Sequence, residues 1–452
     1  AAIKFGEIIL GMKGWQTLLI AGSITLIYSA LGGLKAVIIT DLVQFIMAMI
    51  GSVWACIYLI NLDQVGGLTA LLENSLVMEK MSLLPDFSDP SIWVPILMVP
   101  LAVQWWASYY PGSEPGGGGY IAQRMLSAKD ERNAMGATLL FNVAHYALRP
   151  WPWILIALAS LVVFPQLSDI QTAFPNLPAD KLGHDVAYPA MLTFLPSGLL
   201  GLVAAALIAA YMSTMSTQLN LGASYLVNDF YRRFIKPDAS EKRLVWVARF
   251  FTVISMALGT ALGLALKDAT QVFNLLLLLG AGTGLIYILR WFWWRINAQT
   301  EIIAMISSLI IACYLTFVHD NMGFLPLEPW MKTVTGAVLT TLVWVISTYL
   351  TPPSDDKTLR NFYRLIKPAG PGWNMVIEKA ALDNEPIEPI SHKDELPLGI
   401  LLMVIGSVTV YGALFASGNW IYGDFIPAII FTIVTAIGSY VLFKTWNKIK
   451  TE

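Results

Sequence analysis

Long apolar runs, separated by short polar segments, make up most of the chain. A helix needs about 20 mainly apolar residues to cross a bilayer. By that measure the pattern predicts transmembrane helices over residues 15–31, 36–60, 92–122, 136–163, 194–228, 244–266, 270–294, 300–318, 331–350, 396–416 and 421–443. We therefore expect about eleven transmembrane helices, preceded by an N-terminal helix remnant at 1–12.

The composition favours a membrane protein over a soluble one. Of the 452 residues, 56% are hydrophobic and only 13% are charged, whereas a soluble domain carries about 25% charged residues. The expected fold class is an all-α polytopic membrane protein embedded in a lipid bilayer. The net charge of −2 excludes a general nucleic-acid-binding surface.

The sequence carries no motif of an enzyme. Cys56 and Cys313 both lie in apolar runs, so they indicate neither a disulfide framework nor a metal cluster, and the histidines lack metal-ligand spacing. No nucleophile–base pair or phosphate-binding loop is recognisable. We predict that the chain is not an enzyme and that no obligate protein partner is involved.

Basic residues concentrate in alternate loops, which predicts the orientation in the membrane. Lys and Arg cluster around residues 35, 124–132, 232–243, 290–295, 357–367 and 444–450. These loops should be cytoplasmic, which makes 61–91 an extracellular loop. The Pro-rich segment 351–395 is then a cytoplasmic linker before two C-terminal helices in 396–452. We expect an integral protein of a bacterial inner (plasma) membrane.

The stretch 92–122 contains a break that an α-helix cannot accommodate. Residues 111–119 hold two prolines and five glycines, and such residues end a helix. A helix broken at membrane depth is typical of the central site of a transporter. The alternative is an ordinary loop after a complete span. Glu114, inside the break, is either a functional carboxylate or a cap for free N–H groups. Tyr109 and Tyr110 lie beside it.

Two polar side chains follow on the next span. His145 and Arg149 are four residues apart and share a helical face, directly before Pro150 and Pro152. They point either at a central cavity or towards the cytoplasmic end, where an arginine reaching the headgroups is ordinary. The candidate substrate-binding residues are Tyr109, Tyr110, Glu114, Arg149 and Asn274.

Hydroxyl side chains gather at the end of the apolar run 198–210. On a helix one face carries Ala210, Ser213, Thr214 and Thr217, and the adjacent face carries Ser213, Ser216, Thr217 and Asn220. Neutral oxygens at membrane depth can replace the hydration shell of a small hard cation. Alternatively, the hydroxyls bond back to carbonyls one turn earlier or bond across helices.

Asp41 is a second buried-carboxylate candidate. It lies about one turn into the span 36–60, and a carboxylate at that depth needs a cationic partner. Either Lys35 or a bound cation would serve.

Three stretches resemble the sodium:solute symporter family. They are GGLKAVIITDLVQ at 32–44, QRMLSAK at 123–129, and AAYMSTMSTQLN at 209–220 together with DFY at 229–231. The resemblance runs from residue 1 to about 298 and implies the leucine-transporter-like inverted-repeat fold. It implies a remainder of the first repeat over 1–60, a complete second repeat over 92–295, and additional transmembrane helices over 296–350. The first repeat is thus incomplete, and the start of the fold is expected upstream of Ala1.

The resemblance also assigns sodium-binding residues. The Ala210 carbonyl, Ser213 and Thr214 fall on the principal sodium site, whose other half lies on the absent first helix. Asp41, Ser213, Ser216 and Thr217 fall on a second sodium site that some members have. The sodium ion is the one cofactor expected.

The function predicted is sodium-coupled import of a small polar solute by alternating access. Inward sodium contributes about 2.3 kcal/mol per charge per 100 mV of membrane potential. The glycine-rich break at 112–119 differs from sugar-carrying members, so a plain sugar transporter is not expected. The alternatives are a proton-coupled carrier, in which Asp41 or Glu114 titrates, and a transporter-like sensor.

Overall fold

The computed structural model describes residues 2–9, 11–31, 34–106, 125–175, 177–178, 182–265, 269–368, 370–387 and 395–446. Within these ranges every regular element is a helix. Eight helices in this part of the chain are long and apolar enough to cross a membrane, and 90–104 and 273–289 form shorter apolar helices. The apolar runs of the sequence thus become helices, as predicted.

The helices fall into two compact units. One comprises residues 1–83, 144–271 and 421–423, and the other comprises 84–143, 272–420 and 424–452. The first contains α1 (Ala2–Ile9), α2 (Gly14–Leu31), α3 (Leu34–Ile60), α4 (Gly67–Glu73), α5 (Ser75–Met78), α9 (Trp151–Val163), α10 (Leu167–Ala173), η5 (His184–Val186), α11 (Ala187–Leu192), α12 (Ser197–Tyr225), η6 (Leu226–Ile235) and α13 (Glu241–Ala265). The helix η3 (Val143–Leu148) begins at the boundary between the two units.

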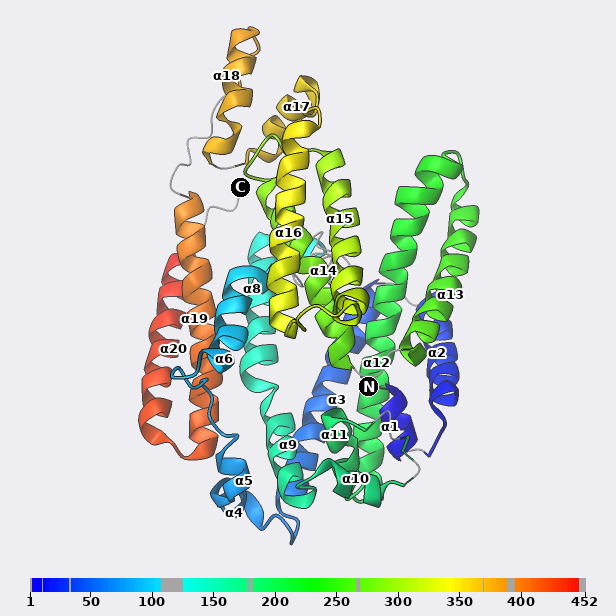
Figure 1. Ribbon diagram of the computed structural model, residues 1–452, viewed down its shortest axis with the longest axis vertical. Coiled ribbons are helices and arrows are strands. Elements are labelled where there is room, and N and C mark those ends of the chain that lie inside the picture. Colours follow the sequence, from blue (N-terminus) through cyan, green and yellow to red (C-terminus); the bar gives the residue numbers. More distant parts are fainter. Residues whose placement is uncertain are drawn as a thin grey trace. The chain divides into compact units, whose positions relative to one another are not determined.

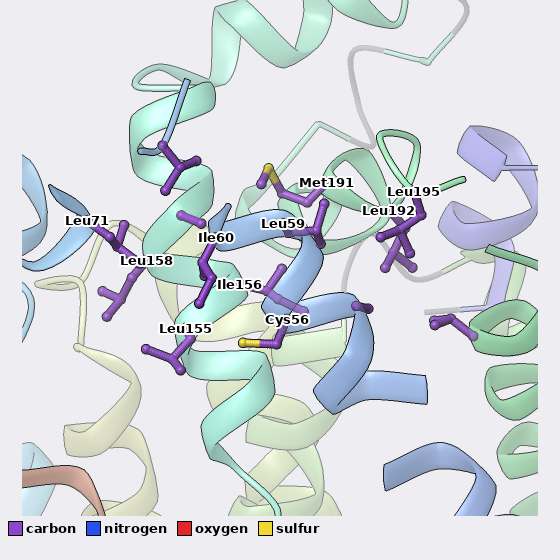
Figure 2. Packing of buried hydrophobic residues seen from close by; sticks show 14 of the residues in the cluster. Cys56, Leu59, Ile60, Leu71, Leu155, Ile156, Leu158, Met191, Leu192 and Leu195 are labelled. Carbon is purple, nitrogen blue, oxygen red and sulfur yellow. The ribbon is translucent and has the colours of Figure 1, made fainter. Parts of the chain in front are cut away.

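The core of the first unit joins α3 to α9, α11 and α12 (Figure 2). It includes Cys56 and Leu59 of α3, Ile156 of α9, Met191 of α11 and, on α12, Val203, each at most 5% exposed. Burying such side chains contributes about 1.5–3 kcal/mol each for the large ones. This cluster fixes the C-terminal half of α3 against the start of α12.

The second unit holds the remaining helices. They are α6 (Pro90–Trp93), η1 (Val94–Met98), η2 (Pro100–Gln104), α8 (Glu131–Asn142), α14 (Ala269–Leu289), α15 (Ala298–Cys313), η7 (Tyr314–Val318), η8 (His319–Met322), α16 (Pro329–Leu350), α17 (Asp356–Ile366), η9 (Pro371–Trp373), α18 (Asn374–Leu382), α19 (Glu395–Tyr422) and α20 (Phe425–Trp446). Helices α15 and α16 pack side by side along most of their length (Figure 1).

The start of the predicted broken helix is wound as two π-helical turns, η1 and η2. Pro95 and Pro100 lack the N–H that an α-helix needs, and the Trp105 amide donates to the Pro100 carbonyl, 3.0 Å away and five residues earlier. Wide turns of this kind often mark functional positions. The break itself, at 111–119, lies outside the described residues.

The segment expected as a cytoplasmic linker contains folded structure. Helices α17 and α18 bury Leu359, Tyr363 and Trp373 in a cluster of their own. The Trp373 indole Nε1 donates to the Trp291 carbonyl at 3.0 Å, and Arg360 pairs with Asp383 and Glu385. We call residues 355–387 the cytoplasmic cap, because they cover the turn that follows α14 and because the basic residues of this segment predict that it is cytoplasmic.

The turn between the last two helices lies later than predicted. We expected it at 417–420, but α19 continues to Tyr422. Ser417 and Asn419 bond back to the carbonyls of Ala413 and Phe415, so their polar groups are satisfied inside the helix. The helix ends instead at Gly423, whose φ of 80° suits a glycine after the last helical residue.

Candidate ion and solute site

Helices α3 and α12 set the geometry of the candidate ion site. A Cβ built on Gly51 of α3 would lie 3.6 Å from side-chain carbons of Leu202 and Val203 on α12, so the two helices are in direct contact there. They run antiparallel: in Figure 1 α3 descends towards α4, whereas α12 rises from the α10–α11 end. This contact defines their register.

The register brings the backbone of Asp41 level with the hydroxyl cluster. Asp41 precedes Gly51 by ten residues and Ser213 follows Val203 by ten, which is about 15 Å along each helix axis. The side chain of Asp41 lies outside the described residues. The backbones of Asp41 and of the hydroxyl-bearing residues are therefore at a similar depth on two packed helices.

Three hydroxyls of this cluster are buried. Ser213 is 9%, Ser216 0% and Thr217 6% exposed. The Ser216 hydroxyl donates to the Ser213 carbonyl at 3.0 Å, so bonding back along the helix, the alternative drawn from the sequence, holds for Ser216. Ala210 and Thr214, the other candidates for the principal site, are exposed and share the neighbouring helical face.

Thr217 differs from its neighbours. Its Oγ1 is buried and has no hydrogen-bond partner among the described residues. A buried hydroxyl without a partner costs about 1–3 kcal/mol, and most Thr residues in the other helices avoid that cost by bonding to the carbonyl four residues earlier, as Thr252 does to Ala248. The Thr217 oxygen therefore fits a cation ligand, because a bound cation would satisfy it.

Sequence reasoning missed one further oxygen in this region. The Oε1 atom of Gln44 on α3 is buried, and within the described part of the chain it meets no hydrogen-bond donor. Gln44 follows Asp41 by three residues, so both lie on one side of α3. The sequence did contain a signal for Gln44: it is a polar amide in an apolar run, three residues after the carboxylate of Asp41.

Arg149 lies well inside its helical run rather than at an end. The run extends over Arg132–Val163, and Arg149 sits in the turn between η3 and α9. Its amide donates to the Ala144 carbonyl at 2.9 Å, which is the wide spacing of a π-turn, and Pro150 follows directly.

The Arg149 side chain is held by two neighbours. Its Nη1 lies 2.9 Å from Nδ1 of His145, and its guanidinium lies 5.4 Å from the ring centroid of Trp153. Arginine can only donate, so Nδ1 of His145 accepts and the neutral ring carries its proton on Nε2. Arg149 remains exposed, and its unused N–H groups are accessible to a solute.

The other solute candidates are distributed differently. Tyr109, Tyr110 and Glu114 lie outside the described residues. Asn274 is half-buried on α14 in the second unit, whereas Arg149 belongs to the first. The two solute candidates that the structure describes therefore belong to different units.

Comparison with known proteins identifies the family. The model of the sodium:solute symporter family matches residues 1–308, which is more than half of the chain. The chain belongs to the sodium:solute symporter family. The sodium/glucose cotransporter of Vibrio parahaemolyticus is 28% identical over 367 residues, covering 77% of this chain and 65% of that protein.

Other relatives are more distant. The human sodium/myo-inositol cotransporter 2 is 25% identical over 386 residues, which are 74% of this chain and 54% of that protein. A solved Na+-coupled sialic acid symporter, in a substrate-bound outward-open state, superposes with a TM-score of 0.56 at 20% identity, covering 78% of this chain and 71% of that one. It supports the leucine-transporter-like fold. The chain spans between about half and two thirds of the length of these curated relatives.

Proposed function

We propose that this chain works as a sodium-coupled symporter that imports a small polar solute by alternating access. Membership of the family supports the reaction class. The observation that carries the proposal for this chain is the Thr217 Oγ1, buried without a partner beside Ser213 and Ser216 and level with Asp41. These oxygens are hard, mostly neutral donors, which suit sodium rather than a softer metal.

In this proposal each residue has a separate task. Asp41 supplies the negative charge that compensates a cation at membrane depth, and Ser213, Ser216 and Thr217 replace part of its hydration shell. The Ala210 carbonyl and the hydroxyls of Ser213 and Thr214 serve a principal sodium site, so Ser213 contributes to both sites. Sodium moving inward then contributes about 2.3 kcal/mol per charge per 100 mV to solute uptake.

For the solute, we propose an oxygen-rich polar molecule that contacts Arg149. The guanidinium keeps N–H donors free after bonding to His145, and planar donors of this kind suit carboxylates or vicinal hydroxyls. Tyr109, Tyr110, Glu114 and Asn274 are the further proposed contacts. Relatives named for glucose, myo-inositol and sialic acid all carry solutes rich in oxygen, which is consistent with this class.

Sodium binding tests the ion site directly. We expect Thr217→Val, in the purified protein, to weaken the binding of radioactive sodium about 10- to 150-fold, because one interaction with a charged partner contributes about 1.5–3 kcal/mol. Thr252→Val on α13 is the matched control, since the Thr252 hydroxyl only bonds to the Ala248 carbonyl. Equal sodium affinity in the two variants would exclude Thr217 as a ligand.

Uptake into proteoliposomes tests the coupling. Solute uptake should require a sodium gradient and an inside-negative potential, and it should stop when choline replaces sodium. Uptake driven by a pH gradient without sodium would instead support the alternative, a proton-coupled carrier. We further propose the bacterial inner membrane as the location, and expression there tests it.

A further inference from the structure

The hairpin formed by α12, η6 and α13 carries basic residues at the end that the sequence assigns to the cytoplasm. Residues 226–249 contain six basic side chains, Arg232, Arg233, Lys236, Lys242, Arg243 and Arg249, against three acidic ones, Asp229, Asp238 and Glu241. All six basic side chains are exposed. No carboxylate of the described residues lies within ion-pair distance of any of them. The hairpin end therefore carries a net formal charge of +3, and none of its basic groups is paired with a carboxylate among the described residues.

Aromatic and apolar side chains continue the same surface along α13. Lys242, Trp246, Arg249, Phe250 and Val253 recur at helical spacing and form one exposed face. Trp246 is 69% and Phe250 59% exposed, and the Arg249 guanidinium lies 5.5 Å from the Trp246 ring centroid. Along the helix the face begins with Lys242, continues with Trp246 and Arg249, which lie against each other, and ends with the apolar Phe250 and Val253.

That order matches the boundary of a bilayer. Basic groups suit phosphates, tryptophan suits the headgroup level, and phenylalanine and valine suit acyl chains. The apolar helix Glu241–Ala261 is long enough to span the membrane, so its basic first turns lie at the surface. A protein partner would not require this graded sequence.

The neighbouring helix η6 adds a second basic and aromatic pair. Phe230 and Phe234 are 50% and 70% exposed, and the Arg233 guanidinium lies 5.6 Å from the Phe234 ring. Nε of Arg243 donates to the Tyr231 hydroxyl at 2.8 Å, which ties η6 to the start of α13. Figure 1 shows the two long helices of this hairpin side by side, in green. The basic groups are thus held in one place rather than scattered.

We propose that this hairpin end binds the headgroup of an anionic phospholipid. Lys242 and Arg249 bind the phosphate, Trp246 packs on the glycerol region, and Phe250 and Val253 contact the acyl chains. Arg232 and Arg233 supply additional charge from η6. The proposal depends on the membrane location of the chain and is independent of sodium coupling.

Native mass spectrometry of the full-length protein in detergent tests the site. The probes are phosphatidylglycerol and phosphatidylcholine with identical acyl chains. We expect phosphatidylglycerol to bind at least about tenfold more tightly, and the double variant K242Q/R249Q to lose about tenfold or more of that affinity. The control K357Q/K444Q removes the same charge from exposed positions on α17 and α20 and should lose less than about threefold.

Three results would overturn the proposal. They are equal binding of the two lipids, an equal loss of phosphatidylglycerol affinity in both double variants, and an unchanged phosphatidylglycerol affinity of K242Q/R249Q. Both double variants are also compared with the parent in thermal unfolding, so that a folding defect is recognised. W246L, which keeps every charge, gives a second measurement. It should modestly weaken the binding of both lipids without changing the preference for phosphatidylglycerol.

Discussion

Gly284 on α14 marks a close approach between two backbones. Trp106, two residues after the end of η2, packs against this glycine. Its indole Nε1 donates to the Ala281 carbonyl at 3.0 Å. A Cβ added at Gly284 would lie 2.5 Å from Cδ1 of Trp106 and 2.6 Å from the Trp106 carbonyl oxygen. Gly284→Ala must therefore push the two segments apart.

The size of the effect follows from three contributions. Overpacking costs about 1–3 kcal/mol, and loss of the indole hydrogen bond costs about 0.5–1.5 kcal/mol if the tryptophan moves away. Alanine gains about 1 kcal/mol of helix propensity over glycine. We therefore expect Gly284→Ala to destabilise the protein by about 1–3 kcal/mol. Because one contact is with a backbone carbonyl, Trp106→Phe should not rescue it.

Gly259 on α13 provides the matched control, because a Cβ there meets nothing within 4 Å. Gly259→Ala should be neutral or stabilise by up to about 1 kcal/mol. The measurement is thermal unfolding of the detergent-solubilised protein, followed by tryptophan fluorescence and by size-exclusion chromatography. If the two variants unfold at the same temperature, Trp106 does not rest on α14 as described.

The cytoplasmic cap yields two further predictions. Trp373→Ala removes a side chain that is 3% exposed and should lower the stability of the cap by about 3–5 kcal/mol. Trypsin should then cleave the variant after Lys367 and Lys379. Equal cleavage of parent and variant would contradict this packing. Hydrogen bonds from the hydroxyl and the amide of Thr358 hold the pKa of Asp355, the N-cap of α17, below its usual value. This stabilisation should be complete above pH about 3.9 and disappear as the pH falls below the lowered value. Asp355→Ala should therefore reduce hydrogen-exchange protection of α17 at pH 5–7, and its difference from the parent should disappear once the pH falls below the lowered pKa of Asp355. Equal protection of the two proteins at neutral pH would refute this.

Much of the helical architecture follows from the sequence, because a long apolar run in lipid has few alternatives to a helix. The ends of the helices are harder to predict, because they depend on which polar side chains can form hydrogen bonds to the helix's own backbone. The predicted spans left a turn at 417–420, yet Ser417 and Asn419 both bond to carbonyls of α19. The wide turns of η1 and η3 share the apolar pattern of α-helices and appear only in the hydrogen bonds.

The cytoplasmic cap was not recognisable from composition. Its Pro- and Gly-rich sequence is typical of a linker, but Trp373 finds a buried partner surface on the turn after α14, far away in the sequence. Spacing along one helix did predict the hydroxyl cluster on α12. It did not identify Gln44, because burial of its Oε1 depends on how a second helix packs against α3.

Because Cys56 is buried, its chemical labelling can report when the surrounding helices move apart. Cys56 is 5% exposed in the core that joins α3 to α9, whereas Cys313 is exposed, and these are the chain's two cysteines. With Cys313 replaced, a membrane-permeant maleimide would react only when this core opens. The labelling rate then measures the breathing of α3 against its neighbours in the absence and presence of sodium, without an introduced probe site.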